Sequence, residues 1–506
     1  MKRRDLFKVA GISAAAVALS GCTATTTAGK ALAGINTRAA DDLYPKGDKK
    51  RLVVVGGGIG GMSIASNIHN KYGDQVEVIV LEQNSRFHAC PGSNILLTKT
   101  ASQYVKEASA TSTWVFDYNK KQSEFNIVTN CTVTGGDIKN KVIHTTQGNI
   151  AYDTLVVATG IAHDAKSQFP TWSQEKLRRL KYETPSAMMA DAGVEWSIMS
   201  ERWEGLIQQA KQNPSKGYVL VINATPKTNL TGGKTLRRCP PAAGERTTVL
   251  ASRIKKENLH NIKIKYMTEL DGSLGSKHGA FKQSWEALGY CKDILNPTSS
   301  DIIEPIFNAR IKDVDFDKKV ITYAQNRINS DLEVVGSDMK AMEYSEAIIM
   351  VYQKTPAIIE TLFNDSNVKL SAGSFECKDF KDHFVLGDSQ TTHQLPPSGS
   401  MAMSIAGIMA GEVIGSLRGK KNAVDYSKAS NTCFSLVGEN PNEAISVSHT
   451  FTVNKGIVKG KGHVPKNAQG IYRDGTIADA QAAWIYSIGA LYGNFGTVEE
   501  GGVLNA

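Results

Sequence analysis

Short apolar runs alternate with helical patterns along the first part of the chain. Leu52 to Val55 is a run of aliphatic, mostly β-branched residues, as in a parallel strand buried on both faces. Met62 to Lys71 has a helical pattern, and Val76 to Leu81 is a second apolar strand. This strand–helix–strand order predicts a βαβ unit at the start of an α/β fold.

The turn between the first strand and the helix has the spacing G-x-G-x-x-G, at Gly56, Gly58 and Gly61. The first glycine permits a tight turn, the second lets a pyrophosphate approach the backbone, and the third lets the helix pack on the strand. Glu82 follows the second strand, where a carboxylate can accept a hydrogen bond from a ribose hydroxyl. Together these features predict a dinucleotide site, and an ordinary glycine-rich turn is the alternative.

Later apolar runs indicate more sheet structure. Phe125 to Thr134 and Lys141 to His144 are typical of a β-meander, and the buried strand that ends at Ala158 continues into Thr159-Gly160. In two-dinucleotide flavoproteins an A-T-G triplet of this kind ends the first half of the FAD domain. The strand from Gly217 to Asn223 begins a second nucleotide-like domain, which lacks a glycine motif and is therefore expected not to bind NAD.

The chain is then expected to return to the first domain. Ala347 to Val351 is a predicted strand, and Phe384 to Leu386 is another that ends in Gly387-Asp388, where Asp388 could hold ribityl hydroxyls. Ser400 to Leu417 reads as a buried helix whose positive end would face the flavin. These pieces indicate FAD in an extended pose between two nucleotide-binding halves.

The patterns predict an α/β fold with two Rossmann-like dinucleotide-binding domains and a small C-terminal α+β domain that faces the flavin or forms a dimer. The expected segments are residues 50–164 (FAD-binding domain, first half), 165–310 (second nucleotide-like domain), 311–420 (FAD-binding domain, second half) and 421–500 (C-terminal domain).

Residues 1–33 have the pattern of an export signal. KRRDLFK at residues 2–8 fits the twin-arginine motif, and the apolar stretch from Val9 to Leu19 is too short to span a bilayer. Leu19 to Cys22 resembles a lipoprotein site that would leave a lipid on Cys22, and cleavage after Ala33 is the alternative. We therefore expect a periplasmic protein that meets the membrane only through such a lipid.

Composition excludes several functions. Of the net charge of +9, +4 lies in residues 1–33, and the remaining +5 is too mild and too scattered to indicate nucleic-acid binding. The ten histidines show no metal-ligand spacing, so no metal is expected.

Among the seven cysteines, Cys239 has the most reactive surroundings. It lies in the segment from Arg237 to Pro241, just before a helix that is expected to begin near Pro241. Two neighbouring cations and a helix N-terminus would stabilise a thiolate there. Glu245, in the first turns of that helix, is a candidate acid/base, and a structural disulfide at Cys239 is the alternative.

From Arg51 to Gly496 the chain resembles the flavoprotein subunit of flavocytochrome c sulfide dehydrogenase, a relative of the sulfide:quinone oxidoreductases among the disulfide-reductase flavoproteins. The motifs that carry this resemblance are VVVGGGIGG, the spacing of Asn84 and Cys90, Arg238 to Pro241 with Glu245, Gly387-Asp388, Pro396 to Gly399, Asn431 to Cys433, and Tyr492 to Gly496.

The resemblance implies that Cys239 and Cys433 form a redox-active disulfide beside the flavin, with Trp484 or Tyr486 nearby, and that Glu245 moves protons. It also implies a covalent bond from Cys90 to the flavin. The cofactor-binding set is Gly56, Gly58, Gly61, Glu82, Cys90, Val133, Thr159, Gly160, Gly387 and Asp388.

The implied activity is oxidation of sulfide or a related small sulfur compound, with electrons passing singly to a separate c-type cytochrome subunit. A sulfide:quinone oxidoreductase and a non-catalytic FAD electron-transfer protein are the alternatives. Pro397 stands where relatives carry a lysine, and residues 224–238 insert a loop before Cys239. The inserted loop favours a sulfur species larger than sulfide.

Overall fold

The computed structural model describes most of the chain from Asp42 onward. The chain divides into two units, Met1–Asp42 and Leu43–Ala506. The predicted export signal with Cys22 lies outside the described residues, as do Arg237, Pro240 and Tyr486. The described residues are 42–90, 97, 105–106, 115–186, 192–226, 238–239, 241–271, 279–331, 333–371, 374–390, 395, 397–420, 429–438, 443–454, 457–463, 471, 484, 487–493, 497–499 and 503–505.

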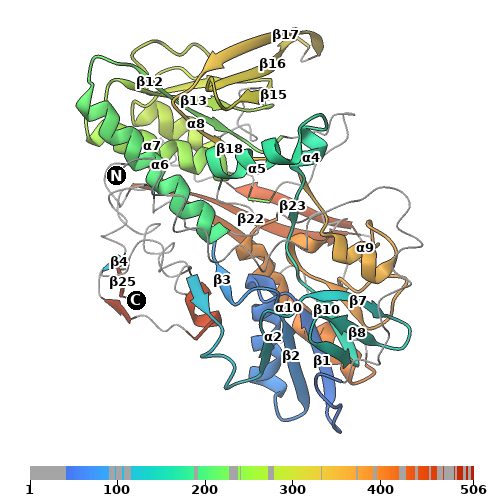
Figure 1. Ribbon diagram of the computed structural model, residues 1–506. Coiled ribbons are helices and arrows are strands. Elements are labelled where there is room, and N and C mark those ends of the chain that lie inside the picture. The colour runs from blue at the N-terminus through green and yellow to red at the C-terminus, as the bar shows by residue number, and fades with distance from the viewer. Residues whose placement is uncertain are drawn as a thin grey trace, which may run out of the picture. The chain divides into compact units, whose positions relative to one another are not determined.

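A five-stranded parallel sheet forms the first domain (Figure 1). Its order is β20 (His383–Val385), β10 (Thr154–Val157), β1 (Lys50–Val55), β2 (Val76–Leu81) and β6 (Asn126–Val128). The prediction that Phe125 to Thr134 belongs wholly to a meander is therefore wrong, because β6 pairs with the edge of the parallel sheet. The meander consists of β7 (Val133–Asp137), β8 (Val142–Thr145) and β9 (Gly148–Ala151).

Both faces of this sheet are covered, which explains why its strands are continuously apolar. Leu52 and Val54 pack with the helices α2 (Ile59–Tyr72) and α10 (Gly399–Leu417), which lie side by side in Figure 1. Val53 and Val55 point to the other face, where they pack with α9 (Ala357–Phe363) and the meander. Alternate side chains of β1 thus pack in two separate hydrophobic cores, one on each face of the sheet.

A four-stranded parallel sheet forms the second domain, in the order β14 (Ile303–Ile306), β13 (Ile262–Met267), β12 (Tyr218–Asn223) and β18 (Glu346–Ile349). Helix α7 (Ala242–Lys256) crosses over from β12 to β13 and packs against both strands. This arrangement corrects the predicted boundary at residue 311. The predicted strand from Ala347 belongs to this sheet and not to the first domain, because β18 pairs with β12.

The remaining elements of the second domain are the helices α4 (Ala165–Gln168), α5 (Gln174–Glu183), α6 (Ala192–Gln212) and α8 (Ala280–Ala287), and the antiparallel strands β15 (Ala309–Asp315), β16 (Val320–Ile328) and β17 (Val334–Glu343). Shorter pieces elsewhere are the pair β3 (Arg86–His88) and β5 (Val115–Asp117), the pair β11 (Ala162–His163) and β19 (Gln353–Lys354), the 3₁₀ helix η3 (Gly387–Ser389), and the sheet of β24 (Thr497–Glu499), β25 (Val503–Asn505) and β4 (Val105–Lys106).

A third sheet from the C-terminal part of the chain connects the two domains. Its strands β21 (Ser430–Leu436), β22 (Ala444–Asn454) and β23 (Ile457–His463) are antiparallel. Strand β21 contacts α10 of the first domain and also α7 of the second, and β22 contacts α8. Residues on β21 therefore lie between a helix of each dinucleotide-type domain.

Helix α10 is long and apolar enough to cross a membrane, and it is the one such helix among the residues that the structure describes. More than half of it is buried inside the protein. Its contacts with α2, β1 and β10 are those of a core helix, in keeping with the pattern in the sequence.

Candidate active site

A cavity of about 690 Å³ is lined by residues of the first domain, of the segment that leads into α7, of α7 itself and of β21. Every residue predicted to be catalytic or cofactor-binding lines it, with the exception of Gly61. These lining residues are Gly56, Gly58, Glu82, Cys90, Val133, Thr159, Gly160, Cys239, Glu245, Gly387, Asp388 and Cys433. The cavity thus has a glycine-rich end on the first domain and a thiol-rich end between α7 and β21.

The glycine-rich end leaves no room for side chains on the loop itself. Gly56 has a φ of +104°, and a Cβ there would lie 2.5 Å from the carbonyl oxygen of Ala158. A Cβ on Gly61 would lie 1.9 Å from the carbonyl oxygen of Gly56. Gly58 is the N-cap of α2 and supplies no side chain to cap it. The first N–H groups of α2 are thus open to an anion such as a pyrophosphate.

Glu82 braces this loop from the end of β2. One carboxylate oxygen accepts a hydrogen bond from Gly57 N at 2.7 Å, and the other accepts from Asn84 N and Asn84 Nδ2, both at 2.8 Å. Burial raises the pKa of Glu82, and these hydrogen bonds oppose that rise. The carboxylate lines the cavity, as a ribose-binding group at this position must.

Two tyrosines close the same loop, and sequence reasoning gave neither of them a role. The hydroxyls of Tyr118 and Tyr492 both donate to the carbonyl oxygen of Gly57, each at 3.0 Å. Phe87 stacks on Tyr492 with ring centroids 4.8 Å apart. Burial raises the pKa of both tyrosines well above the usual range, so both remain protonated donors. Tyr492 belongs to a motif of the resemblance, but no sequence pattern indicates its partner.

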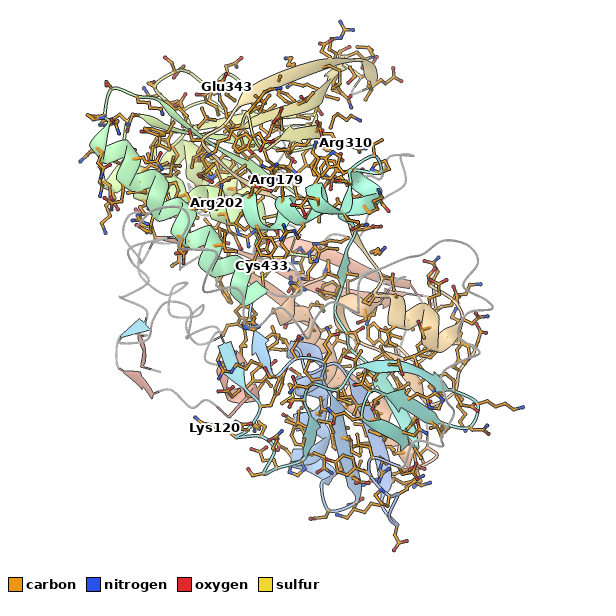
Figure 2. All side chains as sticks on the ribbon, viewed as in Figure 1. Lys120, Arg179, Arg202, Arg310, Glu343 and Cys433 are labelled. Atoms are coloured by element: carbon orange, nitrogen blue, oxygen red, sulfur yellow. The ribbon has the colours of Figure 1, made fainter. Side chains whose placement is uncertain are left out.

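At the thiol-rich end, Cys239 precedes α7, which begins at Ala242 with Pro241 as its N-cap. Cys239 N donates to the carbonyl oxygen of Pro397 at 3.0 Å. Its φ of +47° is left-handed, which is uncommon for a residue with a side chain and is found often at functional sites. Cys433, labelled in Figure 2, lies on β21. Both residues are free thiols in this structure, so their predicted pairing stays a prediction.

The two thiols are strongly biased toward the protonated form. Burial raises the pKa of Cys239 well above its usual value, and the charges of Glu245, Cys90 and Cys433 raise it further, while Arg246 lowers it. Burial and the charge of Glu245 raise the pKa of Cys433 to about 11, against a hydrogen bond from Asn431. The prediction that neighbouring cations and the helix N-terminus hold Cys239 as a thiolate is therefore wrong for the dithiol form. Burial outweighs them.

Glu245 connects the segments that carry the two cysteines. The Ser435 hydroxyl donates to a carboxylate oxygen of Glu245 at 2.7 Å. Ser435 is two residues beyond Cys433 on β21, so their side chains share one face of the strand. This hydrogen bond ties the first turn of α7 to the Cys433 strand and holds the carboxylate within electrostatic range of both thiols. Sequence reasoning missed Ser435.

Arg238 connects Cys90 to the rest of the site. Its guanidinium donates to the Cys90 sulfur, and its Nε lies 3.9 Å from Asp388 Oδ2. Its backbone N–H donates to Gln353 Oε1. Burial alone would lower the pKa of Arg238, but the charges of Cys90, Asp388 and Cys239 outweigh burial and raise it. Arg238 therefore remains a fixed cation beside Cys90 and Cys239.

Two further observations complete the site. Trp484 lines the cavity, and its buried indole N–H has no acceptor in the part of the chain that the structure describes. Within those same residues, no group of three or more His, Cys, Asp or Glu side chains could hold a metal ion.

Comparison with solved structures shows which proteins share the fold. The sulfide:quinone oxidoreductase of the hyperthermophilic bacterium Aquifex aeolicus superposes with a TM-score of 0.58 at 17% identity, over 88% of this chain and 92% of that one. NDH2 of Plasmodium falciparum in complex with RYL-552 gives 0.57 at 10% identity, over 88% and 97%. A chain of the Tetrahymena thermophila mitochondrial ATP synthase gives 0.56 at 14% identity, over 89% and 98%.

At these identities the likeness concerns the fold and not the activity. Residues 50–184 match the family profile described as pyridine nucleotide-disulphide oxidoreductase. This segment contains the glycine-rich loop, Glu82, Cys90 and Thr159-Gly160, which form the dinucleotide end of the cavity. The similarity to this family is therefore confined to the part of the chain that forms the glycine-rich end of the cavity.

Proposed function

We propose that the protein is an FAD-dependent oxidoreductase that oxidises sulfide or a related sulfur compound through Cys239 and Cys433, and that it passes the electrons to a c-type cytochrome. One observation carries the proposal. Cys239 and Glu245, from the start of α7, and Cys433, from the distant strand β21, line the cavity that also holds the glycine loop of the matched segment.

The residues at the first-domain end of the cavity fit FAD, which this family generally binds. The N-terminus of α2 would hold the pyrophosphate, Glu82 the ribose and Asp388 the ribityl chain. The missing side chains at Gly56 and Gly58 leave the cradle that a pyrophosphate needs. When bound, FAD accepts two electrons and can return them one at a time. The Arg238 contact at Cys90 competes with the covalent attachment that the resemblance implies, so we propose FAD without assigning that bond.

The protein's own residues would perform the sulfur chemistry. Hydrosulfide attacks the Cys239–Cys433 disulfide, a new sulfur–sulfur bond forms to one cysteine, and the other cysteine leaves as a thiolate. The substrate sulfur is oxidised by two electrons as it becomes sulfane sulfur, and the disulfide receives them. Glu245, held by Ser435, takes the substrate proton and returns protons to the thiols. A second hydrosulfide attacks the outer sulfur of the persulfide and leaves with it as a hydrodisulfide, so that Cys239 and Cys433 become a dithiol. Bound FAD would supply the two-electron acceptor that this dithiol needs to return to the disulfide.

The electron acceptor and the location belong to the same proposal. A c-type cytochrome suits a periplasmic enzyme exported by a twin-arginine signal, with Cys22 as a lipid anchor if the lipoprotein site is used. A quinone is the alternative acceptor, since the fold is shared with a sulfide:quinone oxidoreductase. A non-catalytic FAD carrier would not need Cys239, Cys433 and Glu245 gathered at one cavity.

The test is an anaerobic titration of the purified protein with sulfide, followed by flavin absorbance. We expect bleaching at stoichiometric sulfide in the wild type and none in Cys433→Ser, with NADH inert in both. A Cys377→Ser variant, which alters a buried thiol outside the cavity, is the matched control. Failure of sulfide to bleach a flavin-loaded protein with an intact disulfide would refute sulfide as substrate. Reoxidation by cytochrome c or by a soluble quinone then distinguishes the acceptors.

A further inference from the structure

The two cavity thiols, Cys239 and Cys433, lie in surroundings that repel anions. Glu82, Glu245 and Asp388 all line it, and the charge of Glu245 raises the pKa of both Cys239 and Cys433. Hydrosulfide and persulfides carry a negative charge at neutral pH. An anionic substrate therefore needs a cation close to Cys239 to offset this repulsion.

Among the cavity-lining residues that the structure describes, two arginines carry positive charge, and only one of them is near the thiols. Arg86 lies on β3, is more than half exposed, and forms an ion pair with Asp117 at 2.8 Å. Arg238 is adjacent to Cys239 and contacts Cys90. Arg246 also lowers the pKa of Cys239, but it is buried and does not line the cavity, so it cannot meet a ligand there.

The backbone holds Arg238 in place, and among the described residues its guanidinium contacts Cys90 and lies near Asp388, which leaves N–H donors available to a ligand. Hydrogen bonds from Arg238 N to Gln353 and from Cys239 N to Pro397 fix the backbone on both sides. A guanidinium has five N–H donors, and Asp388 at 3.9 Å is too far for the paired hydrogen bonds of a close carboxylate. One quarter of the Arg238 side chain is exposed, and the residue lines the cavity.

We propose that Arg238 is the anion-binding residue of the site and that it holds the terminal, negatively charged sulfur of the substrate against Cys239. This inference rests on the proposed function and narrows its substrate class. The substrate is a species with a terminal S⁻, such as hydrosulfide, a persulfide or a polysulfide, and neutral thiols are selected against. After attack on the disulfide, the same guanidinium faces the newly formed sulfur anion and stabilises it.

The first test needs no turnover. The reduced protein is alkylated at low salt with iodoacetate, an anion, and with iodoacetamide, its neutral counterpart, and labelling of Cys239 and Cys433 is followed by peptide mapping. Both reagents require the thiolate, so the ratio of their rates cancels the thiol pKa and reports the charge that a ligand meets. We expect Arg238→Met to lower the iodoacetate-to-iodoacetamide ratio about fivefold, equivalent to ~1 kcal/mol of charge attraction.

Two control variants distinguish a loss of anion attraction from a folding defect. Arg238→Lys keeps the charge and should retain most of the ratio. Arg178→Met removes the same charge from an exposed position on α5 and should leave the ratio unchanged. Equal ratios in wild type and Arg238→Met, in protein with wild-type melting behaviour, overturn the proposal. If Arg238→Met does not fold, thiocyanate is added to Arg238→Lys as an anion that competes with iodoacetate for the cation. An iodoacetate-to-iodoacetamide ratio that thiocyanate leaves unchanged then overturns the proposal.

The second test uses sulfide. We expect Arg238→Met to raise KM for sulfide about tenfold with a smaller change in kcat, because the lost contact is made already in the bound substrate. A wild-type flavin that sulfide does not bleach refutes the proposed function, while the alkylation ratio still decides whether Arg238 binds anions. A bleached wild type with an unchanged KM in Arg238→Met refutes only the role of Arg238.

Discussion

Replacing Glu245 by Gln should make both cavity thiols more reactive. Gln has the same shape and can still accept the hydrogen bond from Ser435, so the change removes a negative charge and little else. That charge raises the pKa of both Cys239 and Cys433. Its removal lowers both pKa values, and the thiolate fraction at a given pH rises.

The size of the effect can be bounded for Cys433. At about pH 8, a thiol with a pKa of about 11 is ionised to about one part in a thousand, against about one part in ten at the ordinary pKa of 9.0. A return of the Cys433 pKa to its ordinary value would therefore increase the thiolate fraction roughly a hundredfold. Burial is the larger cause and is unchanged in Glu245→Gln. We accordingly expect a rise in alkylation rate of about three- to thirtyfold.

The assay is anaerobic alkylation of the reduced protein with iodoacetamide across pH 7 to 10, with peptide mapping to separate Cys433 from Cys239. Glu175→Gln, which removes the same charge from an exposed position on α5, should react like the wild type. A Cys433 rate that is unchanged or slower in Glu245→Gln would show that the carboxylate does not face the thiols. The argument for Glu245 as their proton carrier would then fail.

The remaining predictions concern stability and cofactor retention. Gly61→Ala places a methyl 1.9 Å from the Gly56 carbonyl oxygen, so it should lower both Tm and the flavin-to-protein absorbance ratio. Gly205 lies on α6, and a Cβ added there would enter open space. Gly205→Ala should therefore stabilise the protein by ~0.5–1 kcal/mol in the same melts. Ser435→Ala removes the donor to the Glu245 carboxylate and should cost about 1–3 kcal/mol in urea unfolding, and an unchanged midpoint would show that this part-buried hydrogen bond does not stabilise the fold. Tyr492→Phe should cost only about 1 kcal/mol, because Tyr118 still donates to Gly57, whereas Tyr492→Ala should cost about 3–5 kcal/mol by leaving a cavity in the aromatic stack.

Local sequence patterns were informative wherever the chemistry is local. The glycine spacing and Glu82 lie within one βαβ unit, and α7 begins where the proline pair after Cys239 suggests. It was harder to predict from the sequence which sheet a strand belongs to. A buried apolar run such as Ala347 to Val351 fits the edge of either parallel sheet, and only pairing with β12 decides between them.

The electrostatic state of the thiols could not be read from the sequence. Arg237 and Arg238 beside Cys239 suggest a thiolate, but the sequence does not show how deeply the sulfur is buried or that Glu245 faces it. Ser435 and Tyr492 were missed for a related reason. Each acts on a residue that is distant along the chain, and neither lies in a pattern with a known local partner.

The hydrogen bond between Tyr492 and the glycine loop has a consequence for synthesis on the ribosome. Gly57 and Tyr492 are 435 positions apart, so the ribosome makes the loop long before the tyrosine that closes it. N-terminal segments begin to fold while the rest is still being made, but this contact must wait until Tyr492 has been synthesised. A chain released before residue 492 would keep an open dinucleotide end, even with its first βαβ unit complete. The mature cavity thus requires synthesis of the chain at least as far as Tyr492.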